Sequence, residues 1–297
     1  MPPDFQLNVT TLTIDLLVPT KNRHTCLERS LPSWRKAAAI GGAGIILCDQ
    51  SPEAFAAPGI HVFHRPELSG LPAARNVLLH ASHADVVIFL DDDCEIAPDF
   101  IRAVQRLASQ ESHLLAWGPV VEHRSRWTRR LHRLAHLGAF HDPRRLVDGP
   151  CDHVTSALFG CCFAVRRLAA LRVGFDARRS GYALGEDLDF FRRLAIAHPG
   201  QTIARFVRYL YAHHRKDGAD RADPYRRGLA KGAFLSWLAR RYGRNNPATG
   251  LHFAVALLAA ASGQGHEPAD WRGVLAGITG PVGGNKAKAK NSAKLPE

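Results

Sequence analysis

The sequence lacks a hydrophobic run long enough to cross a membrane. A transmembrane helix needs about 20 consecutive apolar residues. The longest apolar stretch, residues 251–261, has roughly half that length. We therefore expect no segment that spans a membrane.

The sequence also lacks the cysteine spacing of a zinc site or a disulfide framework. No secretory signal precedes the first expected strand. We therefore expect reduced thiols and a cytoplasmic protein. The six cysteines are Cys26, Cys48, Cys94, Cys151, Cys161 and Cys162.

Acidic residues are in deficit. The chain has 27 Asp and Glu against 39 Lys and Arg, which gives a net charge of +12. This excess favours partners that carry phosphate, namely nucleotides, nucleic acid or an anionic membrane surface, and does not choose among them. The hydrophobic fraction of 46% and the charged fraction of 22% are those of an ordinary globular protein with a large core.

Apolar runs alternate with helical patterns over the first hundred residues. This alternation predicts βαβ units in an open, mostly parallel α/β sheet that binds ligands beyond the carboxyl ends of its strands. The run at 85–90 is almost continuously hydrophobic, which indicates a central strand covered on both faces. Strands are expected at 12–19, 45–48, 61–64 and 85–90, and helices within 22–39 and at 71–82 and 100–107.

The rest of the chain has weaker patterns. Further strands are expected at 114–121 and 203–212, a helix at 187–197, and a loop or irregular helix at 124–145. We divide the chain into an α/β domain at 1–225, a C-terminal helical appendage at 226–280 and a disordered basic tail at 281–297. The tail is assigned as disordered because it is rich in Lys, Ala and Asn and has too few apolar side chains to form a core.

Three consecutive aspartates, Asp91, Asp92 and Asp93, follow the run at 85–90. Adjacent carboxylates repel one another unless a cation neutralises them, and a hard divalent ion such as Mg2+ or Mn2+ does so through their oxygens. The alternative is an acidic turn that caps the helix beginning near Pro98.

Two further polar groups lie at the ends of expected elements. Glu186 and Asp187 open a helix, where a carboxylate can act as a general base toward a hydroxyl group or can merely complement the helix dipole. His213 and His214 end the last expected strand, where a neutral imidazole can be a third ligand of a Mn2+-like ion or can be incidental. Spacing alone leaves these alternatives open.

Six short motifs occur in order along the chain. They are VPTKNR at 18–23, DQS at 49–51, GLPAARN at 70–76, FLDDD at 89–93, GFD at 174–176 and GEDLD at 185–189. Together they resemble the family 2 inverting glycosyltransferases of the GT-A fold, over roughly residues 12–215. The resemblance implies an open, mostly parallel (mixed) sheet of GT-A type, flanked by helices.

The resemblance also implies a pocket for a nucleotide-sugar. Pro19, Thr20 and Arg23 should line the nucleotide, and Asp49 should accept hydrogen bonds from its base. Arg75 should lie close to the diphosphate or the base, where its fork of donors bridges oxygens. The alternative for Arg75 is an arginine on the helix surface.

The same resemblance implies a different role for each aspartate of the triplet. Asp93 should bind the Mn2+ or Mg2+ cofactor directly, and Asp91 or Asp92 should contact the ribose or a metal-bound water. Asp91 is also expected as a metal ligand. His213, with His214 as the alternate, should complete the metal site.

Asp187 should then deprotonate the acceptor hydroxyl while Glu186 helps to hold the acceptor. The implied reaction is a single displacement, typical of hexosyltransferases, that inverts the anomeric carbon of a sugar carried by UDP, dTDP or GDP. The implied acceptor is a polysaccharide or other glycan, a lipid-linked glycan or a small molecule.

Two other classes of protein compete with this interpretation. A metal-dependent nucleotidyltransferase needs a glycine-rich phosphate loop after its first strand, and none follows Val18. A basic nucleic-acid-binding module fits the net charge, but no recognised motif is present, so we expect no nucleic acid partner. The basic helical segment at 228–243 is equally compatible with contact with the inner face of an anionic membrane and with a helix that covers the sheet or makes a homodimer contact.

Overall fold

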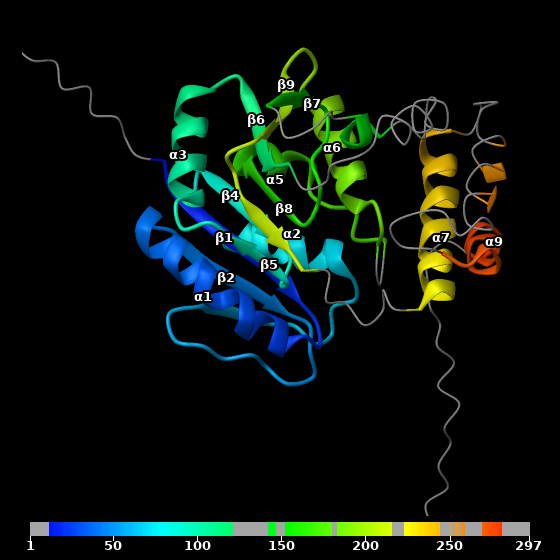
Figure 1. Cartoon of the computed structure of the whole chain (residues 1–297), viewed down its shortest axis with the longest axis horizontal. Coiled ribbons are helices and arrows are strands. Elements are labelled where there is room, and N and C mark those ends of the chain that lie inside the picture. Colours follow the sequence, from blue (N-terminus) through cyan, green and yellow to red (C-terminus); the bar gives the residue numbers. More distant parts are fainter. Residues whose placement is uncertain are drawn as a thin grey trace, which may run out of the picture.

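The computed structural model describes residues 12–120, 142–146, 152–179, 183–215, 223–243, 250, 253–254, 257–258 and 269–280. Over these residues the chain forms an eight-stranded sheet with a two-stranded sheet beside it (Figure 1). The large sheet contains, in spatial order, β3 (His61–His64), β2 (Gly44–Asp49), β1 (Ile14–Thr20), β4 (Val86–Leu90), β8 (Cys162–Arg166), β6 (Leu114–Pro119), β9 (Thr202–Val207) and β7 (His153–Thr155). The small sheet pairs β5 (Cys94–Ile96) with β10 (Ala212–His214).

The direction of the strands changes in the middle of the large sheet. β3, β2, β1 and β4 are parallel to one another. β8 runs antiparallel to both of its neighbours, β4 and β6. β9 is parallel to β6, and β7 closes the sheet antiparallel to β9. The prediction of an open, mostly parallel, mixed sheet is confirmed.

Helices cover both faces of this sheet (Figure 1). Trp34 of α1 and Phe100 of α3 pack with Ile88 of β4 on one face, whereas Leu78 of α2 packs with Phe89 of β4 on the other. Successive residues of β4 thus enter two different cores, and the prediction of a strand covered on both faces is confirmed. The helices are α1 (His24–Gly41), α2 (Leu71–Ala81), α3 (Phe100–Gln110), α5 (Arg167–Val173), α6 (Glu186–Ala197), α7 (Pro224–Tyr242) and α9 (Trp271–Thr279), with a short 3-10 helix η2 (Pro143–Leu146).

The strand predicted at 203–212 is in fact two strands. β9 ends at Val207, the chain turns so that the Leu210 N–H bonds to the Val207 carbonyl at 3.2 Å, and β10 begins at Ala212. β10 then pairs with β5, a short strand that the sequence patterns do not reveal. This pairing carries the two histidines to the aspartate triplet.

α7 and α9 lie side by side at one end of the molecule (Figure 1). Their backbones approach so closely that glycine is required at the contact. A Cβ on Gly232 would lie 2.0 Å from the Val274 carbonyl oxygen, and a Cβ on Gly277 would lie 2.2 Å from the Leu229 carbonyl oxygen. Any larger residue would therefore push the two helices apart.

The C-terminal end of α7 packs against the beginning of α6. The Tyr242 hydroxyl donates to Asp189 Oδ1 at 2.6 Å, and Arg241 Nε lies 3.1 Å from the same oxygen. A Cβ on Gly185 would lie 2.1 Å from the ring of Phe234, so the two elements touch directly. The helical appendage is thus joined to the helix that the GEDLD motif begins.

Several predicted features lie outside the described residues. These include most of 124–145, parts of 226–280 and the whole tail at 281–297. Among the helices that are described, none is long and apolar enough to cross a lipid bilayer. Among the described residues, the five cysteines are not paired in disulfides.

Candidate active site

Three parallel strands have polar residues at or directly after their carboxyl ends. β1 ends at Thr20, β2 ends at Asp49, and β4 is followed directly by Asp91. Thr20 and Asp49 are partners in the strand register. Open α/β sheets bind their ligands at the carboxyl ends of the strands, so this end of the sheet is the candidate site.

A turn after β4 sets the directions of the aspartates. The Asp91 N–H bonds to the Cys161 carbonyl at 2.9 Å, and the Cys94 N–H bonds back to the Asp91 carbonyl at 3.0 Å. The Asp93 carbonyl accepts from the Arg215 N–H at 3.0 Å. These backbone hydrogen bonds fix the conformation of the turn, so that the carboxylates of Asp91, Asp92 and Asp93 do not all point to the same partners.

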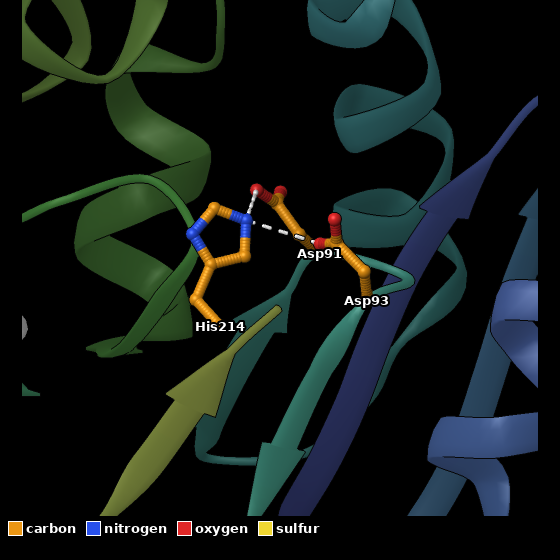
Figure 2. Close-up of side chains that lie close together, drawn as sticks. All are labelled: Asp91, Asp93 and His214. Atoms are coloured by element: carbon orange, nitrogen blue, oxygen red, sulfur yellow. Dashed lines mark ion pairs between the residues drawn. The ribbon is translucent and has the colours of Figure 1, made fainter. Parts of the chain in front are cut away.

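Asp91, Asp93 and His214 bring their potential ligand atoms together, within 4.8 Å of one another (Figure 2). His214 Nε2 lies 3.0 Å from Asp93 Oδ1 and 3.7 Å from Asp91 Oδ2. Carboxylate oxygens are the preferred ligands of Mg2+ and Mn2+, and a neutral imidazole suits a Mn2+-like ion. The residues present therefore fit a divalent cation.

His214, rather than His213, joins this group. β10 pairs antiparallel with β5, and successive residues of a strand point to opposite faces. The His214 side chain is 9% exposed beside the aspartates, whereas His213 is exposed on the other face of the strand. The geometry therefore favours His214, the alternate, over His213, and the role of either histidine as a metal ligand stays a prediction.

Asp92 turns away from this group and is 4% exposed. Its Oδ2 accepts from Thr20 Oγ1 at 2.8 Å, and its Oδ1 lies 2.7 Å from Arg23 Nη1. Burial raises the pKa of Asp92 to about 7, although Arg23 and Thr20 favour its anion. The contact of Asp92 with a ribose or a metal-bound water stays a prediction.

Arg23 bridges two members of the triplet. Its Nη2 donates to Asp93 Oδ2 at 2.7 Å while its Nη1 engages Asp92. Burial acts to raise the pKa of Asp93, but the hydrogen bonds from His214 and Arg23 outweigh it and hold this pKa well below its usual range. The sequence points to Arg23 as a nucleotide contact and gives no sign of this bridge.

Asp49 is completely buried, at 0% exposure. Its Oδ1 accepts from the Ser51 N–H at 2.9 Å, and its Oδ2 accepts from the Phe55 N–H at 2.8 Å and lies 3.0 Å from His24 Nε2. Burial acts to raise the pKa of Asp49, but these hydrogen bonds lower it below its ordinary value. A nucleotide base would reach this carboxylate only after a local rearrangement, so the contact stays a prediction. Pro19 is buried within β1.

Arg75 lies beneath the site, with 1% of its side chain exposed. Its Nη1 donates to Glu186 Oε1, and its Nη2 donates to the Gly160 carbonyl at 2.7 Å and to Asp91 Oδ1 at 3.2 Å. This burial excludes the alternative of a helix-surface arginine. Burial also raises the pKa of Glu186 to about 7, against the opposing effect of Arg75. The predicted contact of Arg75 with a diphosphate stays a prediction.

Asp187 is the next residue of α6, and its side chain is 13% exposed. Its Oδ2 accepts from the Gly160 N–H at 2.8 Å and from Arg144 Nη1 at 2.5 Å, while its Oδ1 accepts from the Leu188 N–H at 2.8 Å. Arg144 comes from η2, within a basic stretch whose sequence has no period or motif to single it out. The sequence analysis therefore missed the side chain that contacts the expected base.

Residues 15–174 match the family model described as Glycosyl transferase family 2, which is more than half of the 297 residues. No curated protein matches the chain in sequence. The family match covers β1 to β8 and the aspartate triplet, and ends before α6.

Solved structures resemble this chain in fold. The mannosyltransferase PcManGT from Pyrobaculum calidifontis, in complex with GDP-Man and Mn2+, has a TM-score of 0.52 and 16% identity, over 86% of this chain and 77% of its own. GalNAc-T7 with UDP, GalNAc and Mn2+ also has a TM-score of 0.52, with 14% identity over 90% of this chain and 57% of its own. TarS from S. aureus has a TM-score of 0.50 and 13% identity, over 77% of this chain and 39% of its own. At these identities the likeness establishes the fold, which is of GT-A type.

Proposed function

This chain belongs to glycosyl transferase family 2, and from that premise we propose that it moves a sugar from a nucleotide-sugar donor to an acceptor hydroxyl with inversion at the anomeric carbon. The family makes the protein a glycosyltransferase. Metal dependence, transfer of a hexose and inversion are the finer parts of the proposal. The metal dependence is supported best by the group that Asp91, Asp93 and His214 form at the carboxyl end of the sheet, whereas hexose transfer and inversion rest on the motifs that resemble family 2 enzymes.

The metal group suits the leaving side of the reaction. A divalent cation, Mn2+ or Mg2+, supplies positive charge to the departing nucleoside diphosphate when it is bound. Asp93 and His214 would hold it, with Asp91 facing them from the turn after β4. Arg23 adds a fixed positive charge at the same edge through its contacts with Asp92 and Asp93.

Asp187 suits the acceptor side. An inverting displacement needs a base that removes the proton of the acceptor hydroxyl while the new bond forms. The carboxylate of Asp187 is partly exposed and is oriented by the backbone N–H groups of Gly160 and Leu188. Glu186 pairs with Arg75 in the interior, so it would support the acceptor site from below rather than contact the acceptor hydroxyl.

The donor in this proposal is a UDP-, dTDP- or GDP-sugar. Among the similar structures, one is complexed with GDP-Man and another with UDP and GalNAc, each with Mn2+. The acceptor is a glycan, a lipid-linked glycan or a small molecule, and the reaction serves glycan or glycoconjugate assembly. We propose a cytoplasmic setting, supported by the free thiols, with the basic helix α7 as the part that contacts the inner face of a membrane or a second copy of the chain.

A thermal shift screen tests the proposal. A ligand that binds only the folded state raises the melting temperature. We expect UDP, dTDP or GDP to stabilise the protein in the presence of Mn2+, and not in the presence of a chelator. Asp93→Asn should abolish this metal-dependent stabilisation. Preference for nucleoside triphosphates, or stabilisation by oligonucleotides, would contradict the proposal.

A further inference from the structure

The reaction proposed above does not use Arg144, although this arginine contacts its base directly. Arg144 Nη1 donates to Asp187 Oδ2 at 2.5 Å and to the Leu158 carbonyl at 3.3 Å. The residue is 7% exposed, which is unusual for an arginine. A buried positive charge in contact with a candidate base affects how that base can take up a proton.

Arg144 is itself held in one orientation. Its Nε donates to Asp142 Oδ1 at 2.8 Å and its Nη2 donates to Asp142 Oδ2 at 3.0 Å, a two-bond pairing that fixes the plane of the guanidinium. The guanidinium carbon lies 5.1 Å from the centre of the Phe159 ring. Burial acts to lower the pKa of Arg144, but the neighbouring carboxylates Asp142 and Asp187 raise it above its ordinary value, so the charge is permanent.

The two oxygens of Asp187 are used unequally. Oδ2 accepts two hydrogen bonds, from Arg144 and from the Gly160 N–H, whereas Oδ1 accepts one, from the Leu188 N–H of the same helix. A carboxylate oxygen accepts about two hydrogen bonds. Among the described groups, Oδ2 therefore has its full number of donors, and Oδ1 has room for one more.

We infer that Arg144 is a positioning residue, which occupies Oδ2 of Asp187 and thereby leaves Oδ1 as the atom that takes the proton of the acceptor hydroxyl. This inference rests on the proposed function. In the step, the acceptor O–H bond breaks as a bond forms between the proton and Oδ1. The freed electron pair of the acceptor oxygen forms the new bond to the anomeric carbon. The bond between the anomeric carbon and the phosphate oxygen of the donor breaks, and its electron pair leaves on the nucleoside diphosphate. Arg144 keeps its own protons throughout.

The charge around Asp187 gives the inference a measurable consequence. Besides Arg144, the ionisable groups of the described residues that act on this carboxylate include Glu186 of α6, Arg75 of α2, Arg179 and the thiol of Cys161. Arg144 is the charged side chain that donates to the carboxylate itself. Removing a positive charge beside a carboxylate disfavours the anion, so the acid limb of the pH profile of kcat should move to higher pH in a variant without this charge.

The test uses release of nucleoside diphosphate from a panel of UDP-, dTDP- and GDP-sugars with Mn2+. For the donor that the wild type uses, Arg144→Gln should lower kcat by about 10- to 100-fold, because the base loses its fixed orientation. Its acid limb should move to higher pH, and its Kd for the nucleoside diphosphate should stay within about twofold of the wild type. Arg144→Lys, which keeps the charge, should return the limb to its wild-type position and recover part of kcat.

Arg193→Gln is the matched control. It removes an arginine whose Nε lies 2.9 Å from Asp189 on the same helix, and it should lower the melting temperature without moving the pH profile. If Arg144→Gln does not fold, the double variant Asp142→Asn, Arg144→Gln replaces it, since it removes a positive and a negative charge together. A folded variant with unchanged kcat and an unmoved acid limb overturns the inference and leaves the proposed function standing. A wild type that releases nucleotide from no donor overturns the proposed function, and the inference with it.

Discussion

His214 Nε2 lies 3.0 Å from Asp93 Oδ1, although the two residues are far apart in the sequence. The turn between β4 and β5 supplies the aspartate, and β10, which pairs with β5, supplies the imidazole. The group that fits a cation therefore depends on the pairing of β10 with β5, and a change in that register would remove one of its three members.

His214→Ala should weaken binding of Mn2+ by at least about 10-fold, because it removes an imidazole from the metal group. The matched control is His213→Ala, which removes the exposed neighbour and should leave the affinity unchanged. Titration of Mn2+ followed by electron paramagnetic resonance measures both affinities. Equal effects of the two variants would contradict the assignment of His214.

Asp187→Asn should lower kcat by about 10²- to 10⁴-fold, because an amide cannot accept the proton of the acceptor hydroxyl. The Kd for the donor nucleotide should change by less than about twofold. Asp189→Asn is the control: its carboxylate binds Tyr242 and Arg193, so its loss should lower the melting temperature and spare kcat. A parallel loss of kcat and donor affinity in Asp187→Asn would point to a structural role instead.

Arg75→Met should reduce the free energy of unfolding by about 3–5 kcal/mol, because it leaves the buried carboxylate of Glu186 and the half-buried carboxylate of Asp91 without their cation. The double variant Arg75→Met, Glu186→Gln removes one of these carboxylates and should recover part of the loss. Urea unfolding measures both. A loss below about 1 kcal/mol would mean that water reaches Glu186 and screens its charge.

Glu186 should make the protein less stable as the pH rises toward neutrality. Its pKa is raised from an ordinary 4.5 to about 7, so the folded state holds a proton that the unfolded state releases between these two values. The free energy of unfolding is therefore expected to fall with rising pH in this window, by up to about 1.4 kcal/mol per pH unit. Burial gives Asp92 a pKa of about 7 as well, which adds a fall of the same sign.

Glu186→Gln isolates this effect, since glutamine does not titrate. Unfolding by urea at several pH values between 5 and 8 should show a shallower fall for the variant than for the wild type. The fall should persist in part because Asp92 is unchanged. Identical slopes in the two proteins would show that Glu186 is ionised in the folded state, with Arg75 outweighing burial.

Gly232→Ala should destabilise the contact between α7 and α9 by about 1–3 kcal/mol, because its methyl group would lie 2.0 Å from the Val274 carbonyl oxygen. Gly250→Ala is the control, since a Cβ there meets no atom of the described residues within 4 Å. Limited proteolysis and the melting temperature report the change. Equal behaviour of the two variants would mean that the helix pair separates at no cost.

Most strands of the large sheet could be predicted from the sequence because they contain apolar runs, whereas β7 and β8 were not expected. Each such run is a local property of the chain, and β4 lies within the run at 85–90 that the sequence analysis expected. The family motifs added the prediction that Asp91 and Asp93, which follow this strand, bind a metal. By contrast, β5 and β10 have three residues each, and their pairing depends on the tertiary fold rather than on local pattern.

The side chains that support the site could not be predicted for the same reason. Whether His213 or His214 faces the aspartates depends on the register of β10, since one step along a strand reverses the face. Arg144 reaches Asp187 from a segment without periodicity. Arg75 matched a motif, but the motif does not state that the guanidinium is buried between Asp91 and Glu186.

The contact of α7 with α6 bears on how the chain can be shortened. A fragment that stops at residue 225 would contain every predicted ligand and the predicted base, but it would lack Tyr242 and Arg241. Asp189 would then lose two of its partners, one turn away from the start of the helix that carries Asp187. The domain boundary predicted at residue 225 therefore separates Asp189 from the α7 side chains that hold it, and such a fragment is expected to melt at a lower temperature than the whole chain.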